Sequence, residues 1–304
     1  MSPSAQYIKD LCLFIAGVIS YITGLTTNLF IVGVSVVDRL IRRPLTPADL
    51  LITAIATSRI IFQLNIFVII FFQEYSAAYS IAFSSIGNFS IYCNIWCSVL
   101  LSVFYSLKIG NFHNFLHRCL KLISRRVLLL ILGSVLLSIA YTSVLHMRNF
   151  MIIPKNSTQE GDGSLAIRLI MDLFLLLWNV LPFLFYAGSS FALLGSLCRH
   201  MYRMRREDNV TGRMDAYYKT IKFTIFSFFS FAFYVTINVF GSDFFDHFGS
   251  LLMWNCFPLL HSIYIIYMTA RLRATFLNIL HGLNKCFLPR KCSPSRSKVV
   301  AQIN

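Results

Sequence analysis

The chain contains seven runs of predominantly apolar residues, each about long enough to cross a bilayer as a helix. The hydrocarbon core offers no water to backbone polar groups, so such runs fold as transmembrane helices that satisfy their own backbone. The expected spans are Leu11–Val37, Ala48–Phe72, Ala82–Ile109, Arg126–Met147, Ile167–Leu197, Ile221–Val239 and Gly249–Ala270. The predicted fold class is therefore all-α: a polytopic membrane protein built as a seven-transmembrane helix bundle.

Composition supports a membrane protein. Hydrophobic residues make up 57% of the 304 residues and charged residues 13%, whereas soluble domains carry about 25% charged residues. A net charge of +15 would suggest nucleic-acid binding in a soluble protein. Here the basic residues gather in loops beside the membrane, which argues against a nucleic-acid partner.

Lysine and arginine placement predicts the orientation. Of the 27 basic residues, 22 fall in the loops after spans one, three and five or in the tail. Cytosolic loops are enriched in these residues, so the amino terminus is expected outside and the carboxyl terminus inside. The predicted layout is an extracellular segment 1–10, a helical domain 11–270 and a cytosolic tail 271–304. Within the domain, an outer loop covers about 148–166 and a cytosolic loop about 198–220.

A glycosylation sequon gives an independent indication of this orientation. Asn156 begins Asn-Ser-Thr, a sequence that accepts a glycan in loops facing the exterior. It falls in the predicted outer loop, so we expect Asn156 to be glycosylated.

Arg59 lies in the middle of the second apolar run. A guanidinium at that depth costs about 2.5–3.5 kcal/mol on insertion scales, so it faces polar partners inside the bundle. We expect those partners to be Asn28 in the first span and polar groups near His261 and Ser262 in the seventh. Two interpretations stay open: a static structural bridge, and a bridge that rearranges between two states of the protein.

Five short motifs in order resemble the type 2 (bitter) taste receptors, a family of G-protein-coupled receptors. They are GLTTNLFI at 24–31, SRI at 58–60, LSVFYSLKIGNF at 101–112, SLCRHMYRM at 196–204, and FPLLHS at 257–262 followed by LRATFL at 272–277. The resemblance covers nearly the whole chain. Thr269 and Tyr217 depart from the family pattern.

The resemblance implies a plasma-membrane receptor for small, mostly apolar bitter compounds. It also implies a heterotrimeric G protein of the gustducin or inhibitory type as partner, and no enzymatic activity or cofactor. The residues expected to face the ligand are Gln63, Asn65, Trp96, Cys97, Leu100, Trp178, Tyr234 and Met253; ordinary packing is the alternative for each. Those expected to face the G protein are Tyr105, Lys108, His200, Arg203 and Lys222.

Other interpretations remain. A vomeronasal type 1 pheromone receptor has a similar size, and a small-molecule transporter or channel belongs to a different class that uses repeated helices or deep acidic rings. The eight cysteines show no metal-ligand spacing, so no metal is expected. Membrane lipids are expected partners of the basic segments. Cys286 and Cys292 are candidates for palmitoylation.

Overall fold

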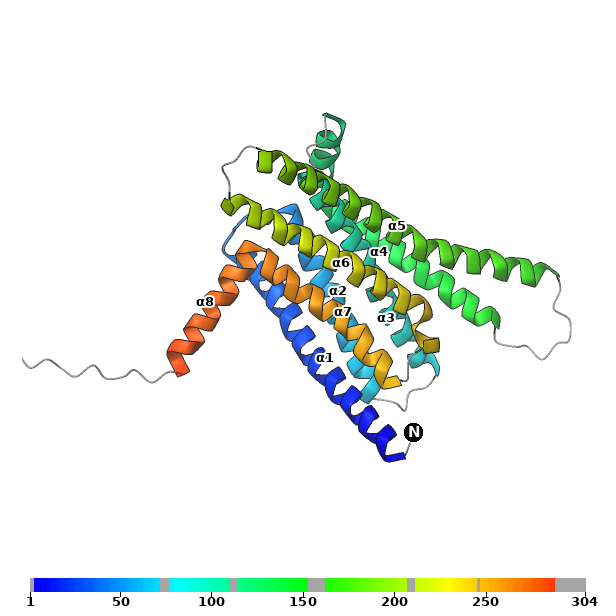
Figure 1. Ribbon diagram of the computed structural model, residues 1–304. Coiled ribbons are helices and arrows are strands. Elements are labelled where there is room, and N and C mark those ends of the chain that lie inside the picture. The colour runs from blue at the N-terminus through cyan, green and yellow to red at the C-terminus, as the bar shows by residue number, and fades with distance from the viewer. Residues whose placement is uncertain are drawn as a thin grey trace, which may run out of the picture.

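The computed structural model describes residues 3–71, 77–109, 114–152, 162–206, 211–244 and 247–287, and these residues are almost entirely helical. The helices are α1 (Pro3–Leu40), α2 (Pro47–Phe71), α3 (Ala77–Ile109), α4 (Asn114–Ile152), α5 (Asp162–Arg206), α6 (Thr211–Phe244), α7 (His247–Met268) and α8 (Ala270–Phe287). Figure 1 shows α1 to α7 side by side in one bundle, with α8 leaving it at an angle. This confirms the predicted all-α class.

The bundle helices have the length and composition of membrane spans. Six of them, α1 to α6, are long and apolar enough to cross a bilayer, and α7 carries a shorter apolar stretch, Leu252–Met268. Each predicted span overlaps one of these seven helices. Many leucines on the outer faces are exposed, as on α5 at Leu173, Leu177 and Leu184. Such a surface is expected where side chains face lipid rather than water.

The helices differ from the predicted spans mainly at their ends. α5 continues to Arg206 and α6 begins at Thr211, so helix occupies much of the segment 198–220 that was predicted as a loop. α4 begins at Asn114 and is kinked at Arg126, where φ is −115° and ψ is 20°. Hydropathy marks only the embedded part of a helix, and the backbone bonds continue beyond it into polar sequence.

Two buried clusters fill the bundle. The first joins α1, α2, α3, α4, α7 and the start of α8 around Ile31, Leu51, Ile55 and Cys97. The second joins α2 to α7 and is rich in aromatic rings, among them Tyr92, Tyr186, Phe231, Tyr234 and Phe257.

An ion-pair cluster holds the start of α8 against the bundle. Arg271 Nη1 lies 2.9 Å from Asp38 of α1 and 3.4 Å from Asp49 of α2. Asp49 also accepts hydrogen bonds from the backbone N–H and hydroxyl of Thr46, which cap the start of α2. One arginine thus ties three helices together at this end of the molecule.

Candidate functional site

Arg59 is the centre of the buried polar network. Its side chain comes from α2 and the residue is 2% exposed. Its Nε donates to Asn94 Oδ1 of α3 at 2.9 Å. Its Nη1 donates to Ser262 Oγ at 2.8 Å and to the Pro258 carbonyl at 3.2 Å, both on α7. The guanidinium therefore uses three of its donors to connect α2 with α3 and α7.

The fourth contact of Arg59 fixes the protonation of His261. Arg59 Nη2 lies 2.7 Å from His261 Nδ1. A guanidinium can only donate, so Nδ1 must accept and the ring hydrogen must be on Nε2. His261 is therefore a neutral imidazole that presents Nε2–H on the side away from Arg59.

Asn28 joins the network through Ser262. The Ser262 hydroxyl donates to Asn28 Oδ1 at 2.7 Å, and Asn28 Nδ2 donates to the Gly24 carbonyl of its own helix. The expected direct pair between Arg59 and Asn28 is replaced by this bridge. The structure brings together all four predicted polar-core residues and adds Asn94, which sequence reasoning missed.

The charge of Arg59 is met by neutral groups. No carboxylate in the described ranges forms an ion pair with it, and its Cζ lies 5.7 Å from the centre of the Phe257 ring. Hydrogen bonds to charged groups are worth about 1.5–3 kcal/mol, more than bonds between neutral groups. The network therefore stabilises the packing of α2 against α3 and α7.

An aromatic cluster lies beside the polar network, around Trp96, which follows Asn94 by two residues on α3. Trp96 meets Trp178 of α5 edge to face, with ring centroids 6.2 Å apart. Tyr234 of α6 stacks on Phe257 of α7 at 4.6 Å. Three predicted ligand-facing residues, Trp96, Trp178 and Tyr234, thus lie in one cluster that spans α3, α5, α6 and α7.

Several buried polar atoms in this part of the bundle have no hydrogen-bond partner among the described residues. The indole N–H groups of Trp96, Trp178 and Trp254 are buried and have no hydrogen-bond partner within the described ranges. The same holds for Gln63 Oε1 and Asn65 Oδ1. A buried polar group without a partner costs about 1–3 kcal/mol, so a bound molecule that supplies partners gains affinity here.

The remaining predicted ligand residues lie elsewhere. Cys97 is fully buried in the first cluster, between α3 and its neighbours α2 and α4, and Leu100 packs against that same cluster. Cys97 points about 100° away from Trp96, because successive residues of a helix are that far apart, whereas Leu100 lies one turn along nearly the same face as Trp96. Met253 is half-buried on α7.

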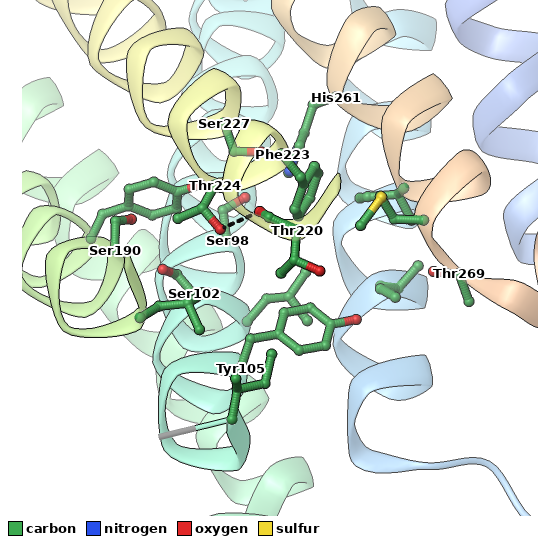
Figure 2. Close-up of a pocket in the computed structure, with 17 residues that line it drawn as sticks. Ser98, Ser102, Tyr105, Ser190, Thr220, Phe223, Thr224, Ser227, His261 and Thr269 are labelled. Atoms are coloured by element: carbon green, nitrogen blue, oxygen red, sulfur yellow. Dashed lines mark hydrogen bonds between the residues drawn. The ribbon is translucent and has the colours of Figure 1, made fainter. Parts of the chain in front are cut away.

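A cavity of about 170 Å³ lies between α3, α5, α6 and α7, next to the Arg59 network and toward the carboxyl end of α3. Figure 2 shows His261 at one end of this cavity and Tyr105 at the other. Hydroxyl groups line it at helical spacing: Ser98 and Ser102 on α3, Ser190 on α5, and Thr220, Thr224 and Ser227 on α6. Sequence reasoning missed the cavity, although that spacing of Ser and Thr was visible.

One of these hydroxyl groups is available to a ligand or to water. Ser98 Oγ is buried without a hydrogen-bond partner among the described residues, whereas Ser227 interacts with the hydroxyl of Tyr186. Thr224 donates to the Thr220 carbonyl, and Ser102 bonds to Ser189 at 2.7 Å. His261 and Ser98 thus both line the cavity, together with apolar side chains such as Leu101, Leu193 and Ile265.

The residues expected to face a G protein gather at one end of the bundle. Tyr105 lines the cavity, and exposed Lys108 ends α3 with its Nζ 6.0 Å from the Phe104 ring centre. His200 of α5 stacks on Tyr217 of α6 at 6.3 Å. Arg203 on α5 and Lys222 on α6 are exposed. Asn156 and Cys292 lie outside the described residues.

Comparisons with known proteins agree with one another. A family model described as "Taste receptor protein (TAS2R)" matches residues 5–284. Taste receptor type 2 member 119 of Rattus norvegicus is 30% identical over 308 residues, which cover 93% of this chain and 89% of the rat protein. Taste receptor type 2 member 31 of Homo sapiens is 26% identical over 296 residues, covering 86% and 91%.

The fold has a known counterpart. The crystal structure of squid rhodopsin aligns with a TM-score of 0.56 at 14% sequence identity, covering 93% of this chain and 89% of the squid chain. At that identity the likeness concerns the seven-helix receptor fold alone.

Proposed function

The chain belongs to the TAS2R family of taste receptors, and from that premise we propose that it detects small, mostly apolar bitter compounds and activates a heterotrimeric G protein. As a member, it is a multi-pass chemosensory G-protein-coupled receptor of the plasma membrane and not an enzyme. Membership also favours the taste type over the vomeronasal and transporter alternatives. We further propose a G protein of the gustducin or inhibitory type.

The observation that carries the ligand proposal is the aromatic cluster with its unpartnered indole N–H groups. Trp96, Trp178 and Trp254 offer large apolar faces and three donors without partners among the described residues. Gln63 Oε1 and Asn65 Oδ1 are also without partners among the described residues, but Gln63 contacts Gly24 and Asn255, and Asn65 lies beside Gly87. Such a site suits a ligand with an apolar body and one or two acceptor atoms. Cys97 and Leu100, which pack in the other cluster, are weaker candidates for direct contact.

A ligand at the aromatic cluster activates the receptor by binding one of two helix arrangements more tightly than the other. A ligand shifts the equilibrium only if it binds one arrangement better than the other. Phe257 stacks on Tyr234 and on His261, and His261 contacts Arg59. The aromatic cluster and the polar network therefore share side chains, so a shift of α6 or α7 in the first changes the second. We propose the rearranging interpretation of the Arg59 bridge on this ground.

A substitution of Trp96 tests the ligand site. In cells with a promiscuous G protein and a calcium indicator, Trp96→Ala should lower agonist potency about tenfold, the equivalent of one lost hydrogen bond and its packing, about 1.4 kcal/mol. Phe185→Ala, an exposed aromatic of α5, is the matched control. Unchanged potency in Trp96→Ala at equal surface expression would place the ligand elsewhere.

The same cells test the coupling and the orientation. Ligand-evoked signals should require the co-expressed G protein; currents or uptake without it would instead support a transporter. We propose an extracellular amino terminus and a cytosolic tail, from the distribution of arginine and lysine. Asn156→Gln should then remove a glycan and increase gel mobility. A wild-type chain that carries no glycan and shows its amino-terminal epitope only after permeabilisation would overturn that orientation.

A further inference from the structure

A groove on the lipid-facing side of the bundle has the features of a second binding site. It has a volume of about 380 Å³ and lies between α2 and α4, with Cys93 and Phe89 of α3 among its lining residues. Arg39 and Leu45 line one end of it and Ile61 the other. Its α2 wall runs from Leu50 to Ile61, about 16 Å of helix. That is close to half of the hydrocarbon core of a bilayer, about 30 Å thick.

Apart from Arg39 at one end, the walls of the groove are mostly apolar, and their hydroxyl groups have already used their hydrogens. Four hydroxyl residues line it, yet each already donates to a backbone carbonyl of its own helix: Ser35 to Ile31, Thr53 to Asp49, Thr57 to Thr53, and Ser58 to Ile55. The other lining side chains include Leu128, Ile131 and Val135 of α4. This groove therefore differs from the cavity next to the Arg59 network, where the Ser98 hydroxyl has no partner among the described residues.

The end of the groove at Arg39 is strongly basic. Arg42 and Arg43 follow Arg39 in a tight turn, closed by hydrogen bonds from Arg42 N to Arg39 O and from Arg43 N to Asp38 O. Arg125 and Arg126 lie just before Leu128 on the opposite wall, and all five arginines are exposed. The nearby carboxylates of Asp38 and Asp49 are paired with Arg271. The cluster thus presents positive charge where the headgroup of a lipid would lie.

We propose that this groove binds an anionic glycerophospholipid of the inner leaflet, with one acyl chain between α2 and α4 and its headgroup at Arg39. The choice of leaflet depends on the orientation proposed above. Lipid tails are as apolar as the groove walls, so the chain gains little by leaving bulk lipid. The arginines therefore decide which lipid occupies the groove, because each basic residue near an anionic headgroup contributes about 1 kcal/mol.

Native mass spectrometry of the purified full-length receptor tests the headgroup contact. The probes are phosphatidylserine and phosphatidylcholine with the same palmitoyl and oleoyl chains, offered in equal amounts. We expect a one-to-one adduct that favours phosphatidylserine, and a preference reduced about fivefold in Arg39→Gln. Arg273→Gln, which removes an exposed arginine of α8, is the matched control. An equal preference in both variants would overturn the proposal.

A second pair of variants tests the groove itself. Thr57→Phe adds a ring at an exposed lining position, and Ala140→Phe adds the same ring on an exposed position of α4 outside the groove. Only Thr57→Phe should abolish the adduct. Unchanged binding in Thr57→Phe, or full competition by soluble glycerophosphoserine, would assign the contact to the headgroup alone and refute an acyl-chain groove. Neither measurement needs agonist or G protein, so the result is independent of the proposed signalling function.

Discussion

Ser262 is the residue whose loss most directly tests the polar network. Its hydroxyl accepts from Arg59 Nη1 at 2.8 Å and donates to Asn28 Oδ1 at 2.7 Å. Alanine fits in the same space, so Ser262→Ala removes both bonds without a clash. Arg59 keeps its bonds to Asn94, His261 and the Pro258 carbonyl, whereas Asn28 Oδ1 loses the partner that the structure gives it.

The expected loss of stability follows from the two bonds. Hydrogen bonds between helices in a membrane are worth about 0.6 kcal/mol on average and about 1.7 at most. One of the two involves a charged donor, and such bonds are at the strong end of the range. We therefore expect Ser262→Ala to lower the free energy of unfolding by about 2 kcal/mol.

Reversible unfolding of the purified receptor in mixed micelles measures this difference. Ser58→Ala is the matched control, since Ser58 is buried beside Arg59 but its hydroxyl donates only to Ile55 of its own helix. The control should cost about 0.5 kcal/mol or less. Equal losses in the two variants would refute the bridging role of Ser262. Strict additivity of Ser262→Ala with Asn28→Ala would also contradict it, because bonded partners should show coupling.

Two further predictions concern other contacts. Arg271→Ala should increase amide hydrogen exchange in α8, because Arg271 pairs with Asp38 and Asp49 across three helices. The side chains of Arg271, Asp38 and Asp49 are only 18%, 9% and 12% exposed, so the change leaves two mostly buried carboxylates unpaired and should cost about 3 kcal/mol. Arg273→Ala should leave exchange unchanged. Gly24→Ala should lower the unfolding temperature modestly, because the new Cβ would lie 2.5 Å from Gln63 Nε2, so that the buried side chain must shift and lose its bond to Asn255. Gly33→Ala meets nothing within 4 Å and should gain about 1 kcal/mol from helix propensity. Equal temperatures for the two glycine variants would contradict this packing.

The sequence was sufficient to predict the helices and the inward position of Arg59, because length, hydropathy and the cost of a buried charge are properties of the chain itself. It was not sufficient to predict Asn94 as a partner. These helices are apolar on most faces, so periodicity does not mark the face that points inward. Trp96 and Cys97 illustrate the limit: they are adjacent in sequence, yet Cys97 belongs to the first buried cluster, whereas Trp96 meets Trp178, which packs against the second.

The Arg59 network also has a consequence for biosynthesis. Arg59 leaves the ribosome 203 residues before Ser262, and at about 5–20 residues per second that interval lasts roughly 10–40 s. Throughout it, the nascent second helix carries a guanidinium without its α7 partners, which makes release into bulk lipid unfavourable. Of the groups that accept a bond from Arg59 in the part of the chain that the structure describes, only Asn94 of α3 is made before the seventh helix, so the full network forms late in synthesis.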